Sequence, residues 1–140
     1  MIKYIGKKEV QAERMNEYRA VELGYARPNE DNHEWREGYH VVYEDGYHSW
    51  SPNYVFEAAY KPSETFLERL HIEAEELAEK QAKLNGFIGS DKFKELSWEH
   101  RKLIEAQFGA MISYLTILLV RIELLTPTHC NVAECCCKQG

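Results

Sequence analysis

The sequence predicts an α+β fold, in which a small N-terminal antiparallel sheet with short helices precedes a long antiparallel helical hairpin. An Asp45-Gly46 pair lies between two β-prone runs, a pattern typical of a β-hairpin. Residues 65–85 and 97–125 then read as two long helices joined by a short connector. We therefore divide the chain into a β-rich module (1–61), a helical hairpin (62–126) that carries the oligomer and ligand surfaces, and a flexible tail (127–140).

Composition limits the classes of function. The chain has 140 residues, 44% of them hydrophobic, and a formal net charge of −6. This size suits one domain, or one domain with an appendage, and the acidic balance argues against a non-specific binder of nucleic-acid polymers. The first residues contain no apolar signal-peptide core, so we expect a cytoplasmic protein with reduced cysteines.

The cysteines all fall in the tail, at Cys130, Cys135, Cys136 and Cys137. Three adjacent cysteines do not match the ligand spacing of a zinc finger. We therefore expect a flexible tail without a metal site.

The N-terminal module has one clear local signal. Residues 3–12 read as a strand broken at Gly6, and residues 15–23 as a short helix that Gly24 ends. In the β-hairpin that follows, a two-residue loop would pair Tyr43 with His48. His40 and His48 would then point to opposite faces of the sheet, so we expect no metal ion between them.

Capping signals mark the helices. Ser51-Pro52 predicts a helix start, and Thr65 with Glu68 has the spacing of a capping box. Asn85-Gly86 suits a left-handed end to this second helix. Ser97 and Pro127 bound the last helix, and residues 91–95 in the connector suit one helical turn.

The last helix is unusual because it carries no charged residue between positions 106 and 120. A helix that is apolar on every side must be covered on every side. The uncharged run is shorter than the roughly 20 residues of a membrane span. We therefore expect protein to cover it, in part from a second copy of the chain and without a membrane.

Catalytic motifs are missing from the sequence: there is no glycine-rich phosphate loop, no Gly-x-Ser-x-Gly and no His-Glu-x-x-His. We expect a protein that is not an enzyme and has no cofactor. Arg121, which follows the uncharged run, leaves two readings open. It is either a helix-end charge that favours the helix C-terminus, or a phosphate ligand beside Tyr114, Phe108, Gln107 and Met111.

Two strings of residues carry a family resemblance. Tyr43-Glu-Asp-Gly-Tyr47-x-Ser-Trp50-Ser-Pro52 is similar to a module common in small phage proteins. Phe66-Leu-Glu-Arg-Leu70, Phe93-Lys-Glu-Leu-Ser97 and Met111-x-x-Tyr114-Leu-x-Ile-Leu118-x-x-Arg121 resemble the C-terminal part of the first anti-Thoeris family of phage proteins. The resemblance does not extend to the tail after Pro127.

This resemblance implies a non-enzymatic sponge in the cytoplasm of the infected bacterium. Such proteins sequester cyclic ADP-ribose isomers made by bacterial TIR-domain defence proteins, and some also capture cyclic oligonucleotides. They assemble as dimers and as hexamers built from dimers. Our candidate ligand-binding residues are Arg121, Arg101, Tyr114, Phe87, Gln107 and Met111. Two alternatives remain open: a phage accessory protein that binds only other proteins, and an enzyme that degrades the same signal.

Overall fold

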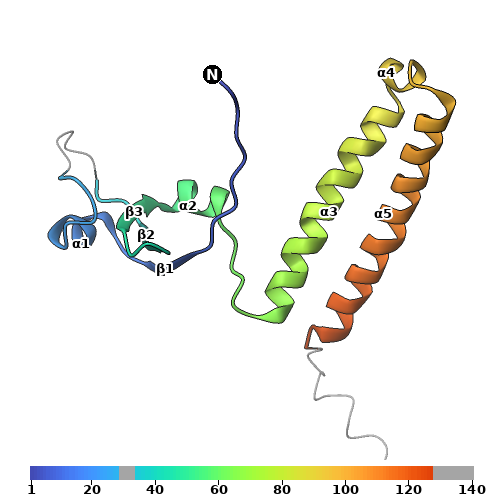
Figure 1. Cartoon of the computed structure of the whole chain (residues 1–140). Coiled ribbons are helices and arrows are strands. Elements are labelled where there is room, and N and C mark those ends of the chain that lie inside the picture. Colours follow the sequence, from blue (N-terminus) through green and yellow to red (C-terminus); the bar gives the residue numbers. More distant parts are fainter. Residues whose placement is uncertain (29–33, 128–140) are drawn as a thin grey trace, which may run out of the picture. The chain divides into compact units, whose positions relative to one another are not determined.

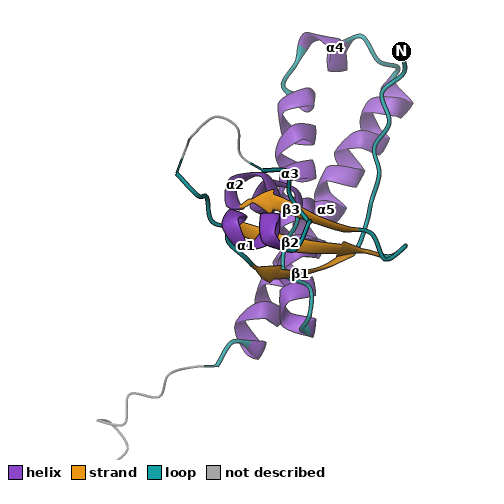
Figure 2. Ribbon diagram, turned by 90° about the vertical axis from the view of Figure 1, so that its left-hand side faces the viewer, coloured by secondary structure: helices purple, strands orange, loops and turns teal. Residues whose placement is uncertain are grey.

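The computed structural model describes residues 1–28 and 34–127, and it divides the chain into two compact units, Met1–Lys61 and Pro62–Gly140. The first unit holds a three-stranded antiparallel sheet with two short helices, and the second holds a helical hairpin (Figures 1 and 2). The predicted α+β class is confirmed. The cysteine tail lies outside the described residues.

The sheet has the strand order β1-β2-β3, with β1 at Val10–Arg14, β2 at Gly38–Tyr43 and β3 at His48–Pro52. The prediction of a strand over residues 3–12 is wrong for most of its length, because residues 1–9 form no strand. Ile2 and Ile5 are exposed there, so no burial favours extended pairing. Helix α1, Glu17–Glu22, follows β1 and ends before Gly24, whose φ of 78° only glycine adopts easily.

The predicted register of the β-hairpin is wrong by one residue. Val42 pairs with His48, and Tyr43 bonds to Tyr47 through its N–H and the Tyr47 carbonyl at 3.0 Å. The loop therefore has three residues, and its last, Gly46, has a φ of 81°. A turn that ends in a left-handed glycine adds one residue and forms a bulge. A shift of one residue exchanges the faces of the sheet.

The N-terminal unit is held by close packing and by an ion pair whose carboxylate is buried. Ala20 and Val41 are its most buried apolar side chains. A Cβ at Gly38 would lie 2.3 Å from the Ser51 carbonyl oxygen, so the approach of β2 to β3 requires glycine there. The Glu17 carboxylate accepts from the Arg36 guanidinium at 2.7 Å. This hydrogen bond raises the pKa of Arg36, against the opposing effect of desolvation.

Helix α2, Asn53–Ala59, begins one position later than Ser51-Pro52 predicted, because β3 continues through Pro52 and Pro52 itself becomes the N-cap. Phe56 of α2 stacks on Tyr39 of the sheet with ring centroids 4.2 Å apart. The Tyr39 hydroxyl donates to Glu57 at 2.9 Å, and this bond raises the pKa of Tyr39.

The helical unit consists of α3 (Phe66–Ile88), the single turn α4 (Asp91–Lys94) and α5 (Trp98–Leu125). Both partners of the predicted capping box at Thr65 and Glu68 make their bonds, and Ser97 caps α5 as predicted. The predicted stop at Asn85-Gly86 is wrong, since α3 continues to Ile88 and Gly86 keeps a negative φ. Phe87 and Ile88 are half-buried, and their packing offsets the weak helix propensity of Gly86.

Helices α3 and α5 run side by side in opposite directions, with α4 at the closed end (Figure 1). Leu70 and Ala74 of α3 pack with Leu118 and Ile122 of α5 to form the core, and partly buried leucines extend it. The buried and half-buried positions of α5 alternate in steps of three and four residues, which is the spacing of an antiparallel coiled-coil seam. They are Arg101, Ile104, Phe108, Met111, Leu115, Leu118 and Ile122.

The rest of α5 is open in one chain. Leu103, Ile117 and Leu124 are 70%, 57% and 80% exposed, although the sequence predicts cover on every side. By length and composition alone, Trp98–Leu125 could also cross a membrane, as the core helices of soluble proteins often could. The expectation that its apolar run is too short for a bilayer therefore does not hold for the whole helix.

Candidate ligand-binding site on the helical unit

Arg121 lies at the open end of the hairpin, where the last turns of α5 meet the first turn of α3. Its guanidinium carbon is 5.7 Å from the centroid of the Phe66 ring, a cation–π contact. Arg121 is exposed and makes no ion pair with any residue that the structure describes. The face of a guanidinium can stack on an aromatic ring. The N–H groups along its edge can then donate hydrogen bonds to a phosphate.

Arg101 lies at the opposite, closed end, on the seam that faces α3. It is half-buried, and its Nε is fully buried without a hydrogen-bond partner among the described residues. A buried donor without an acceptor costs about 1–3 kcal/mol and calls for an explanation. Because Nε is closed off from solvent, an anionic ligand would reach it only if this end of the hairpin opened.

Phe87 is at the same end as Arg101. Its ring meets Phe93 edge-on with centroids 6.0 Å apart, and Phe93 is 7% exposed. Ser90 supports this corner, because its hydroxyl donates to the Phe87 carbonyl and accepts from the Phe93 N–H. Phe87 is therefore held in place by Phe93 and remains half-buried.

The remaining candidates lie between the two ends. Tyr114 is 43% exposed and Gln107 is exposed, whereas Met111 is half-buried on the seam. At about 1.5 Å per residue, Arg101 and Arg121 are roughly 30 Å apart along α5. One chain therefore does not bring the six predicted residues together. It divides them into a closed-end set, an open-end set and a central strip.

Sequence reasoning missed Phe66 as the partner of Arg121. The signal was present, because an antiparallel hairpin brings the start of its first long helix beside the end of its second. Phe66 is the first residue of α3 and is 53% exposed, so its ring is open to solvent beside Arg121.

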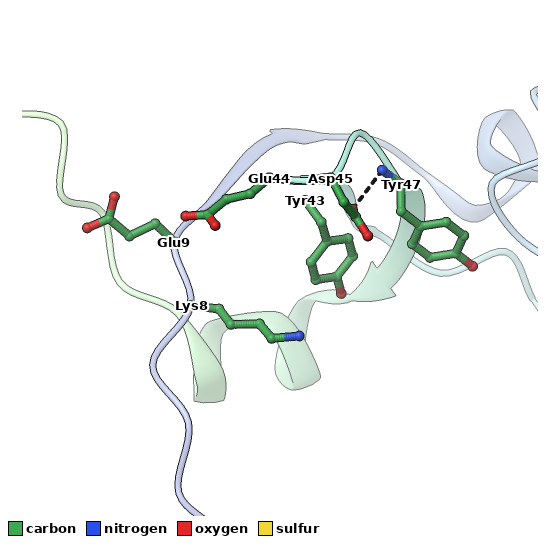
Figure 3. A pocket seen from close by; sticks show the side chains of 6 residues that line it. All are labelled: Lys8, Glu9, Tyr43, Glu44, Asp45 and Tyr47. Atoms are coloured by element: carbon green, nitrogen blue, oxygen red, sulfur yellow. Dashed lines mark hydrogen bonds between the residues drawn. The ribbon is translucent and has the colours of Figure 1, made fainter.

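A groove of about 440 Å³ in the N-terminal unit was not predicted. Figure 3 shows its lining side chains, with Lys8 and Glu9 on the segment that leads into β1 and with Glu44 and Asp45 at the hairpin tip beside Tyr43. The Lys8 ammonium is 5.9 Å from the centroid of the Tyr43 ring. Three carboxylates against one ammonium would repel a phosphate, so the arginines of the helical unit remain the better anion ligands.

Comparison with known proteins gives one finding. The family model described as Sequestin matches residues 64–124, from just before α3 almost to the end of α5. No curated protein and no solved structure matches the chain. The matched region holds every candidate ligand residue, and the family's name denotes sequestration, which means binding rather than catalysis. Residues 64–124, which form most of the helical hairpin, therefore match the Sequestin family, and this match covers just under half of the chain.

Proposed function

We propose that this chain is a phage anti-defence sponge that binds a cyclic ADP-ribose isomer, keeps it intact and so prevents activation of the Thoeris effector in the bacterial cytoplasm. The Sequestin match over the hairpin carries this proposal. The string from Met111 to Arg121, which resembles the anti-Thoeris family, lies inside the matched region. Cyclic oligonucleotides are a second ligand class on the same resemblance.

The chemistry of the candidate side chains supports binding. A cyclic ADP-ribose isomer offers two phosphates and an adenine ring. Guanidinium groups bind phosphate oxygens two at a time, and Phe or Tyr rings stack on adenine. Arg121 lies over Phe66, and Arg101 lies at the end that holds Phe87, so each end of the hairpin has one arginine and one aromatic ring.

We also propose that the ligand-binding form is a homo-oligomer, because one chain leaves an apolar face of α5 exposed. A second series on α5 repeats in steps of three and four residues, and all its members are exposed: Leu103, Ala106, Ala110, Ser113, Ile117, Val120 and Leu124. Such a series suits self-pairing of two helices. In an antiparallel pair centred near position 111, the end of α5 that holds Arg101 would lie level with the partner's opposite end, although Arg101 itself lies on the seam that faces α3. We therefore propose a homodimer, alone or within a hexamer, as the form that covers this face of α5.

The deciding experiment is retention of intact ligand. The full chain is mixed with glycocyclic ADP-ribose, freed of unbound nucleotide and then heat-denatured, and the released nucleotide is identified by mass spectrometry. A sponge returns unchanged ligand in a fixed ratio to protein. Release of a product would show an enzyme. Failure to retain any nucleotide would favour the alternative, a phage accessory module that binds only proteins through its helices.

A further inference from the structure

A chain of hydrogen bonds crosses all three strands of the N-terminal sheet on one face. Glu13 of β1 lies 2.9 Å from Nδ1 of His40 on β2, and Nε2 of His40 lies 2.8 Å from Nδ1 of His48 on β3. The corrected hairpin register makes this possible, because His40 and His48 now share a face. The Tyr25 ring stacks on both imidazoles, with centroids 4.3 and 5.1 Å away.

The position of each hydrogen follows from the chemistry of the partners. An ionised carboxylate only accepts, and the Glu13 side chain is 68% exposed, so His40 Nδ1 carries a hydrogen. In a neutral ring the other nitrogen, Nε2 of His40, must then accept. His48 Nδ1 therefore donates to it. The contact between the two histidines holds one hydrogen.

The hydrogen-bonded series of Glu13, His40 and His48 can take up one added proton but not a second. A first proton can go to Nε2 of His48, which is exposed, and every hydrogen bond remains. A second would put a hydrogen on His40 Nε2 as well. Two N–H bonds of about 1 Å facing each other across 2.8 Å would leave their hydrogens less than about 1 Å apart. The two rings would also both be positive.

We propose that Glu13, His40 and His48 form a one-proton latch that fastens β1, β2 and β3 together and opens when both imidazoles are protonated. Apart from these three, the titratable group in contact with the imidazoles among the described residues is Tyr25, through its ring face. His40 is 8% exposed, so its proton must arrive through His48 or through local opening of the sheet.

The latch makes the N-terminal unit labile to acid. When both histidines are charged in the unfolded chain, the unfolded chain holds one proton more than the folded unit, which takes up only one. Stability then falls as the pH falls, by up to about tenfold in the folding equilibrium constant per pH unit.

The test compares the full-length protein with His48→Gln. A glutamine amide can turn either its oxygen or its NH₂ group toward His40 and so satisfies both protonation states. Unfolding of β1–β3 is followed by amide hydrogen exchange between pH 5 and 8. We expect the acid-dependent loss of protection to shrink by up to about tenfold per pH unit in His48→Gln. His100→Gln, at an exposed histidine of the helical unit, should behave as wild type.

A measurement on the wild-type chain keeps the proposal testable even if His48→Gln unfolds. Nitrogen-15 spectra of the imidazoles should show His40 and His48 titrating together in two coupled steps. Independent single titrations, or equal acid dependence in wild type and His48→Gln, would overturn the latch. Stabilisation of the wild type by Zn²⁺ that is lost in His48→Gln would overturn it in favour of a metal site.

Discussion

Replacing Arg121 by alanine tests the proposed site most directly. Arg121 is exposed and contacts Phe66 by a cation–π interaction, which is worth about 0.5–1 kcal/mol at such a position. The free energy of unfolding should therefore fall by no more than about 1 kcal/mol. The loss in ligand affinity should be larger, since a desolvated phosphate would lose its charged partner. Such losses are ~2–5 kcal/mol, or roughly 30-fold to several-thousand-fold.

Isothermal titration calorimetry with glycocyclic ADP-ribose measures this difference, and two further variants make it specific. Arg121→Lys keeps the charge but loses the bidentate geometry, so its affinity should also fall. Lys102→Ala removes another exposed cation of α5, which pairs with Glu105 at 2.8 Å, and should bind as wild type. Unchanged affinity of a folded Arg121→Ala oligomer would refute the role of Arg121. Arg101 would then be the candidate residue for binding the phosphate, with Phe87 and Tyr114 as stacking partners.

The other predictions concern assembly and stability. Ile117→Glu, on the exposed face, should dissociate the oligomer in light scattering yet keep the helical circular dichroism. Leu118 is 0% exposed, so Leu118→Glu should unfold the hairpin, because a buried unpaired carboxylate costs several kcal/mol. A wild-type monomer at micromolar concentration would refute the interface on α5. Thr65→Ala should lower the free energy of unfolding by about 1 kcal/mol in denaturant titration, since it removes the capping box; no loss would show that the cap is redundant. Truncation after Thr128 should change neither melting temperature nor ligand binding, and zinc-dependent melting of the full chain would contradict this.

The fold could be predicted where local chemistry decides it. The capping box at Thr65 and a stripe of apolar residues predicted the first long helix, and the Ser97 cap with the uncharged run predicted the second. The hairpin position was equally clear from Asp45-Gly46, but its register was not. The same dipeptide serves a two-residue loop and a three-residue loop with a bulge, and packing of the sheet faces decides between them.

The candidate site was harder to predict for a geometric reason. Sequence patterns identify which residues can bind phosphate or stack on a base, but they do not say which of these converge. Arg101 and Arg121 share one helix, and this alone separates them by roughly 30 Å. The partner of Arg121, Phe66, is distant in sequence and near only because the hairpin folds back. Such contacts follow from topology rather than from local propensity.

The boundary between the two units has a consequence for how such chains evolve. The first unit ends at Lys61, the Sequestin match begins at residue 64, and no helix or strand spans positions 60–65. Genetic recombination at this point would cut no hydrogen-bonded element and would leave each half with its own core. A break here would let one hairpin be inherited with many different leading modules. The ligand specificity and the acid-sensitive sheet could then be selected independently of each other.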